Sequence, residues 1–267
     1  MLRPPPILKA FWHFHERDAT YHAAGIAFYL LFSLTPFLLL TLSIAAVLSA
    51  DSGAFVGMFE SWFQANIPRH ADALRDSLLQ VFEHRGRIGI VGVIWLFLTA
   101  RKLFNAMEIG LNAMLEIEKP KSGVLTTLAS LAFIFLTAVL FLASVLVTAL
   151  VDLAFGIQVS FLSSGVGSIL SILLKALFSG AVSVGLLYGI YRLAPSRGLG
   201  SRDAFMASAC ATLMWLVARH AFVWFGASQL ARYEWLYGSL ASFLMLLLWA
   251  YVFAIALLMG ACVVHRK

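Results

Sequence analysis

The stretch Ser239-Leu-Ala-Ser-Phe-Leu-Met-Leu-Leu-Leu-Trp-Ala-Tyr-Val-Phe-Ala-Ile-Ala-Leu-Leu-Met-Gly-Ala-Cys-Val-Val264 contains no charged residue. A helix needs about 20 apolar residues to cross the roughly 30 Å hydrocarbon core of a bilayer. An open strand is excluded, because it would leave backbone N–H and C=O groups unpaired in lipid. The stretch therefore predicts a membrane-spanning α-helix.

Five other apolar stretches of comparable length precede it. They cover residues 23–49, 88–107, 124–151, 166–191 and 204–225. The chain is 61% hydrophobic and 12% charged, with a mean hydropathy of +0.91, whereas soluble domains carry about 25% charged residues. A soluble protein of 267 residues cannot bury this much apolar surface in one core. We expect an all-α polytopic membrane helix bundle with about six transmembrane helices, forming a single integral membrane domain over residues 1–267.

Lysine and arginine are distributed unevenly between the segments that connect these spans. Twelve of the nineteen fall in one set of segments, which includes both chain ends, and five fall in the other set. Basic residues accumulate on the cytoplasmic side of a membrane, so both termini are predicted to be cytoplasmic. The N-terminal Met-Leu-Arg-Pro-Pro-Pro lacks the apolar core of a signal peptide, and we expect the first span to be permanent.

The predicted outer loop, residues 50–87, carries two apolar faces at helical spacing. The first face comprises Phe55, Met58, Phe59, Trp62 and Phe63, and the second, after Pro68, comprises Leu74, Leu78, Val81 and Phe82. This pattern predicts two amphipathic helices that lie on the outer surface or cap the bundle. A similar helix is predicted on the inner surface from Ile7, Leu8, Phe11, Trp12 and His15.

Lys175 is a cation within the fourth predicted span. It lies roughly ten residues from the outer end, which is about 15 Å of helix. A lysine side chain reaches only about 6 Å, and a charge at this depth costs at least about 2.5 kcal/mol. We interpret Lys175 as an anion-binding residue in a polar cavity. The alternatives are a lysine bonded to backbone carbonyls in the bundle interior, or a different span boundary.

Arg219 and His220 lie about six residues from the outer end of the fifth predicted span, and we expect them to join Lys175 in substrate binding. Asp152, at the outer edge of the third span, is a candidate ion-pair partner of Arg219. No carboxylate lies deep in the third to sixth spans. The excess positive charge predicts an anionic cargo, such as a lipid with a phosphate head group.

Pro36 interrupts the first span, where its missing N–H and its ring predict a kink or hinge. The alternative is an ordinary membrane proline whose freed backbone groups are paired by neighbouring hydroxyls. Asn105, Glu108 and Asn112 share one helical face near the inner end of the second span. They predict a polar contact at the inner mouth, or a cytoplasmic extension of the helix.

Several chemistries find no support in the sequence. Cys210 and Cys262 both lie in apolar stretches, so neither a disulfide framework nor a metal cluster is indicated. No standard zinc spacing is formed by the histidines and acids near the N-terminus, which are His13, His15, Glu16, Asp18 and His22. No P-loop occurs, and the acids are too dispersed for a hydrolytic nuclease. We therefore predict no catalytic residues, no metal, no cofactor and no nucleic-acid partner, and a protein that is not an enzyme.

Three separated motifs carry a resemblance to a known family. They are Asp18-Ala-Thr-Tyr-His-Ala-Ala-Gly-Ile-Ala-Phe-Tyr-Leu-Leu-Phe-Ser-Leu-Thr-Pro36, Phe104-Asn-Ala-Met-Glu-Ile-Gly-Leu-Asn112, and Tyr237-Gly-Ser-Leu-Ala-Ser-Phe followed by Gly260-Ala261. The chain resembles, over nearly its whole length, the YihY/BrkB family of bacterial inner-membrane proteins, historically labelled ribonuclease BN-like. The resemblance implies six helices and a bacterial inner (plasma) membrane location. One branch is named for serum resistance, as a virulence factor, and another has been linked to export of lipid A precursors. Many members carry an acid after the terminal Gly-Ala, where this chain has Cys262.

The sequence thus predicts a transporter or flippase for a lipid or another amphipathic anion. The alternative is a membrane scaffold that organises envelope proteins without moving a substrate. Membrane lipids are the expected partners in both cases, and a homo-oligomer or an envelope protein partner is compatible with either.

Overall fold

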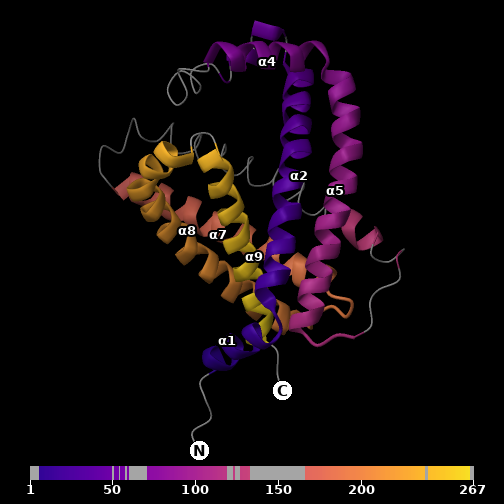
Figure 1. The fold of residues 1–267 in the computed structure, drawn as a ribbon, viewed down its shortest axis with the longest axis vertical. Coiled ribbons are helices and arrows are strands. Elements are labelled where there is room, and N and C mark those ends of the chain that lie inside the picture. Colours follow the sequence, from indigo (N-terminus) through magenta and orange to yellow (C-terminus); the bar gives the residue numbers. More distant parts are fainter. Residues whose placement is uncertain are drawn as a thin grey trace, which may run out of the picture. The chain divides into compact units, whose positions relative to one another are not determined.

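The computed structural model describes residues 6–49, 51–53, 55–57, 59, 71–118, 123, 127–132, 166–237 and 240–264. Within these ranges the regular structure is helical and no strand occurs. The helices are α1 (Pro6–Glu16), α2 (Ala19–Leu48), α4 (Ala71–Glu83), α5 (Arg85–Met114), α7 (Val166–Leu193), α8 (Ser201–Tyr237) and α9 (Leu240–Val264) (Figure 1).

Four stretches of the described helices are long and apolar enough to cross a membrane. They are Ala19–Leu48, Arg85–Met114, Ser201–Ala221 and Phe243–Val264, and Leu177–Leu193 is a shorter apolar helix. The prediction of an all-α, multi-pass membrane protein is confirmed. The fourth predicted span, 166–191, is helical as α7. The third, 124–151, lies largely outside the described residues.

Two helices continue beyond their predicted ends. The second span was predicted to end at residue 107, but α5 continues to Met114, because its last turns bury an apolar face that includes Leu111. The fifth was predicted to end at residue 225, but α8 continues to Tyr237. No glycine or proline interrupts the sequence between Ala227 and Gly238, so nothing there stops the helix.

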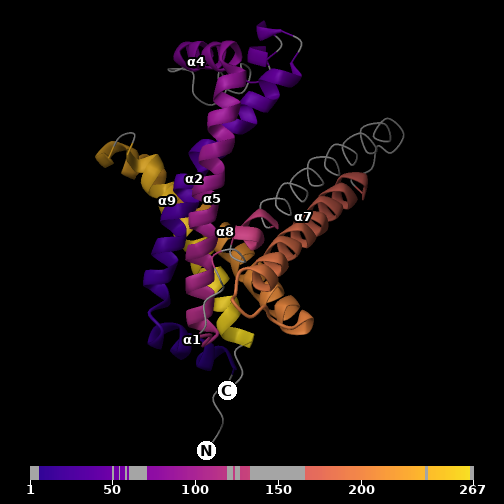
Figure 2. The same cartoon turned by 90° about the vertical axis from the view of Figure 1, so that its right-hand side faces the viewer.

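The chain divides into two compact units, and each is described by itself. Unit 2 comprises Tyr29–Lys102, and unit 1 comprises Met1–Phe28 and Leu103–Lys267. In unit 2 the second part of α2 and the first part of α5 run side by side as a hairpin (Figures 1 and 2). The helices are close at Gly92, where a Cβ would be in ordinary van der Waals contact with Leu40, 3.5 Å from its backbone N.

The end of this hairpin is covered by the predicted amphipathic helices. Phe55, Val56 and, from α4, Leu78 are buried against Ala46 of α2. Phe59, Val81 and Phe82 pack around this cluster, so both predicted apolar faces cap the helices. Met58, Trp62 and Phe63 of the first face lie outside the described residues.

Pro36 is buried in α2, and the helix continues through it from Ala19 to Leu48. The nearby Ser33 hydroxyl donates to the Leu30 carbonyl at 2.8 Å. This hydrogen bond lies within the turn before Pro36. The role of Pro36 as a kink or hinge stays a prediction.

In unit 1, α8 packs against both α7 and α9, and α1 packs against α9. Small side chains, among them Ala207 and Ala211 of α8 and Ala254 of α9, are fully buried and allow close approach of the helices. Aromatic side chains extend the contact between α8 and α9, where the Trp215 and Trp249 rings meet edge to face with centroids 4.4 Å apart. These contacts give unit 1 a defined arrangement in which the polar residues described next are held.

Candidate functional site

A part-buried polar cluster lies where α5 meets the segment between α7 and α8. Ser196, in that segment, has its N atom 2.8 Å from Asn112 Oδ1 and its Oγ atom 2.7 Å from Asn112 Nδ2. The same Oγ lies 2.9 Å from Oε1 of Glu108, a residue that is only 4% exposed. All three residues belong to unit 1. The Glu108 cluster, as we name these three residues, ties α5 to the turn of the α7–α8 hairpin.

The hydrogen bonds of the Glu108 cluster determine one another's direction. The backbone N–H of Ser196 can only donate, so the facing atom of Asn112 is the amide oxygen and its amide nitrogen donates to Ser196 Oγ. The single hydroxyl proton of Ser196 is then donated to the carboxylate of Glu108. A chain of donors therefore ends on Glu108 at this end of the hairpin.

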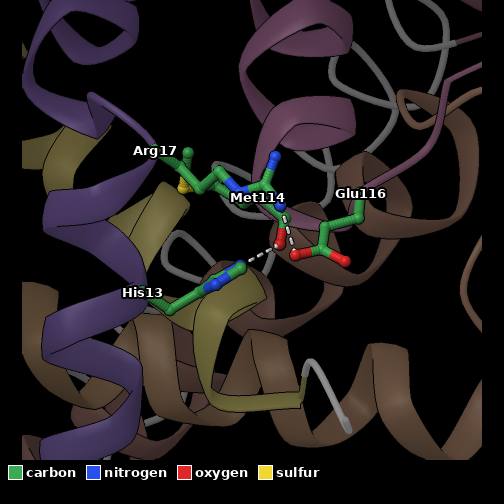
Figure 3. Close-up of polar contacts among 4 residues, drawn as sticks. All are labelled: His13, Arg17, Met114 and Glu116. Atoms are coloured by element: carbon green, nitrogen blue, oxygen red, sulfur yellow. Dashed lines mark hydrogen bonds and ion pairs between the residues drawn. The ribbon is translucent and has the colours of Figure 1, made fainter.

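The end of α5 is also held by α1. The ring N–H at Nε2 of His13 donates to the Met114 carbonyl at 2.8 Å, and Arg17 forms an ion pair with Glu116 (Figure 3). Asp18 and Glu116 both adopt left-handed backbone conformations, with φ of 49° and 55°, beside these contacts. Such an exposed ion pair contributes at most about 1 kcal/mol to the free energy of unfolding. Its main effect is to align the turn at Asp18 with the turn at Glu116.

The three sequence motifs meet at one crossing in unit 1. A Cβ placed on Gly110 of α5 would lie 3.1 Å from Leu258 Cδ2 of α9, 3.3 Å from His22 Cβ and 3.4 Å from Ile26 Cδ1, both of α2. Gly110 belongs to the second motif, His22 and Ile26 belong to the first, and Leu258 lies two residues before the Gly260-Ala261 of the third. The glycine in Glu-Ile-Gly-Leu-Asn is therefore needed for the close approach of three helices.

Gly260 of α9 occupies a second tight contact. A Cβ at this position would lie 2.8 Å from the Ala207 carbonyl oxygen and would overlap the hydroxyl of Tyr191. That hydroxyl donates to the Leu257 carbonyl at 2.6 Å. Cys262, where many relatives of the resembled family carry an acid, is buried with its Sγ 3.4 Å from Met114 Sδ.

The predicted substrate-binding residues lie on α7 and α8. Lys175 is within α7, ten residues along it, and its side chain lies outside the described part of the structure. Arg219 and His220 are exposed on α8, where His220 Nδ1 donates to the Leu216 carbonyl at 2.8 Å. Asp152 also lies outside the described residues, so its proposed pairing with Arg219 stays a prediction.

The predicted inner-mouth residues separate into two groups. Glu108 and Asn112 are brought together by Ser196, whereas Asn105 is exposed on the same helix. Ser196 and Tyr191 were not singled out from the sequence. The segment Ala194-Pro195-Ser196 between two apolar stretches was the available signal for Ser196, because a proline there predicts a turn at a helix end.

Substitution of Asn112 by alanine is expected to lower the free energy of unfolding by about 2 kcal/mol, because two hydrogen bonds of about 1 kcal/mol each are lost. Thermal unfolding of the purified chain in detergent measures this change. Asn105→Ala is the matched control, since Asn105 is exposed on the same helix. Equal unfolding temperatures for the two variants would contradict the structural role of the Glu108 cluster.

Comparison with known proteins identifies relatives over most of the chain. A family model described as virulence factor BrkB matches residues 10–265. A putative ribonuclease-like protein YfkH of Bacillus subtilis is 27% identical over 92% of this chain and 90% of its own length. UPF0761 membrane proteins of Vibrio atlanticus and Alcanivorax borkumensis are 26% and 25% identical, over 92% and 95% of this chain and 77% and 59% of their own lengths. No solved structure matches the chain. With a family model that covers nearly all of its residues, the chain belongs to the virulence factor BrkB family of membrane proteins.

Proposed function

We propose that the protein is a transporter or flippase that moves a lipid or another amphipathic anion across the bacterial inner membrane. Both chain termini lie in the cytoplasm in this proposal, as the distribution of lysine and arginine predicts. The proposed activity involves no covalent chemistry, no cofactor and no nucleic acid. Its substrate contacts are Lys175, Arg219 and His220.

The observation that carries the proposal is the position of two cations on one helical hairpin. Lys175 lies eighteen residues before Leu193, where α7 ends, and Arg219 lies eighteen residues after Ser201, where α8 begins. Each is therefore about 27 Å of helix from the turn between them. Because α8 continues to Tyr237, Arg219 stands at the middle of its helix and further from the end than the sequence predicted. Ionisable residues within membrane spans commonly mark a substrate or ion path, and two cations favour an anionic substrate.

A membrane scaffold is the second candidate function. The amphipathic helix α1 exposes Phe11 and Trp12, and exposed aromatic side chains of this kind suit a partner protein or a homo-oligomer contact. A scaffold requires no polar path, so the surroundings of Lys175 discriminate between the two functions.

Lys175→Cys is expected to react with a charged, membrane-impermeant thiol reagent in reconstituted protein that also carries Cys210→Ala and Cys262→Ala. A thiol in a wet cavity forms the reactive thiolate, so its labelling is expected to exceed that of a lipid-facing thiol by about tenfold or more. Leu177→Cys is the control, because Leu177 is exposed on the apolar surface two residues along α7. Absence of labelling at both positions would oppose the transporter and favour the scaffold.

A further inference from the structure

The hairpin of α2 and α5 in unit 2 carries an open groove of about 460 Å³. Its walls are almost wholly apolar and include Leu40, Ile44 and Val47 of α2 and Ile90, Val93 and Ile94 of α5. This volume is within the range of about 300–1,000 Å³ that is typical of small-molecule sites. Gly86 and Gly89, which also line it, leave the groove open because they carry no side chain.

One end of the groove lies beside a cationic residue. Arg85, the first residue of α5, lines it, and the guanidinium Nη1 donates to the Phe82 carbonyl at 2.8 Å. The guanidinium carbon also lies 4.2 Å from the centroid of the Phe82 ring. These contacts hold the arginine in place, and among the described residues they use one of its five N–H donors, on that carbonyl.

The groove has the dimensions and direction of a lipid chain in one leaflet. From Arg85 to Ile94 it follows α5 for about 14 Å, which is close to half of a roughly 30 Å hydrocarbon core. It runs along two helices that are long and apolar enough to span a membrane. An acyl chain in a bilayer lies in the same direction, with its polar head group at the interface.

We infer that this groove binds one acyl chain of an anionic phospholipid, with the lipid phosphate held at Arg85. A planar guanidinium donates paired hydrogen bonds to phosphate oxygens, whereas the apolar walls accept only hydrocarbon. The inference names the amphipathic anion and in that respect rests on the proposed function. Binding at Arg85 is nevertheless measurable without transport, and the groove is separate in sequence from Lys175.

Binding of phosphatidylglycerol and phosphatidylcholine to the full-length protein in detergent, followed by native mass spectrometry, tests the inference. The wild-type protein is expected to bind phosphatidylglycerol about tenfold more tightly than phosphatidylcholine. Arg85→Gln is expected to abolish this preference, and Arg85→Lys to retain part of it because the charge remains. Lys102→Ala removes an exposed cation that does not line the groove and is expected to leave both affinities unchanged. Because this assay measures binding without transport, it separates failure of this site from failure of the proposed function.

Filling the groove provides the second arm of the experiment. A Cβ at Gly86 meets no other atom within 4 Å, so Gly86→Trp fills the end of the groove beside Arg85 and is expected to weaken binding of both lipids about tenfold. Gly57→Trp is the matched control, because Gly57 is equally uncrowded but does not line the groove. Unchanged lipid binding by Gly86→Trp would overturn the inference. If this variant also had a lower unfolding temperature, the tryptophan would have displaced another segment of the chain, which would then be the occupant of the groove. An undiminished preference in Arg85→Gln would overturn the inference independently.

Discussion

Gly260→Ala is expected to lower the free energy of unfolding by about 3 kcal/mol, because the added methyl group overpacks the contact between α8 and α9. The new Cβ would lie 2.8 Å from the Ala207 carbonyl oxygen and 2.9 Å from Ala211 Cβ. Both atoms belong to α8, whose backbone cannot move away without separating from α9. The methyl group would also displace the Tyr191 hydroxyl from the Leu257 carbonyl.

Thermal unfolding in detergent measures this change, with an expected fall in the apparent midpoint of about 10 °C. Gly180→Ala is the control, since a Cβ at Gly180 meets nothing within 4 Å. The control is expected to be neutral or slightly stabilised, because alanine favours a helix over glycine. A midpoint for Gly260→Ala equal to that of the control would show that α8 and α9 do not pack as closely as described.

Lys175→Ala is expected to reduce the translocation rate of an anionic lipid at least about thirtyfold, which corresponds to the loss of about 2 kcal/mol of charge pairing in a desolvated site. The effect follows from the position of Lys175 in α7, far from both helix ends. Proteoliposomes that contain labelled phosphatidylglycerol measure the rate.

Lys102→Ala is the matched control for this experiment. It removes the same charge from an exposed position on α5, outside α7 and α8, and is expected to retain the wild-type rate. Lys175→Arg is expected to retain part of the activity, because it keeps the cation. Equal rates for Lys175→Ala and Lys102→Ala would remove Lys175 from the transport path.

The membrane helices were predictable from the sequence where contact with lipid is the main requirement, because lipid requires an uninterrupted run of apolar side chains. The uninterrupted apolar stretch 239–264 became α9, Leu240–Val264, and the stretch 23–49 lies almost entirely within α2. The end of α5 was not predictable from apolar content, because Arg101 and Lys102 lower the hydropathy before the helix ends. Its last turns are stabilised by protein contacts, such as the burial of Leu111 and Met114, which a hydropathy pattern does not reveal.

The polar cluster was predictable only in part. Helical spacing placed Asn105, Glu108 and Asn112 on one face, but seven residues extend about 10 Å along the helix axis. Among these three residues Ser196 contacts Glu108 and Asn112, whereas Asn105 is exposed. The partner itself lies 84 residues from Asn112 in the chain, and no local pattern specifies so distant a contact.

The role of glycine in the three motifs shows the same division between local and distant information. The sequence identified Gly110 and Gly260 as parts of family motifs but contained no physical reason for them. That reason is the atoms of other helices, since Leu258 and Tyr191 occupy the space where a Cβ would lie. Packing between helices therefore accounts for glycine at these two motif positions.

The proposed function is tested most directly by the rate at which labelled phosphatidylglycerol crosses the bilayer of proteoliposomes, compared with protein-free vesicles of the same composition. We expect the wild-type protein to accelerate the crossing by about tenfold or more, a lowering of the barrier by at least about 1.4 kcal/mol. Crossing at the protein-free rate, with protein that retains its helical content and cooperative unfolding, would contradict the transporter and support a membrane scaffold.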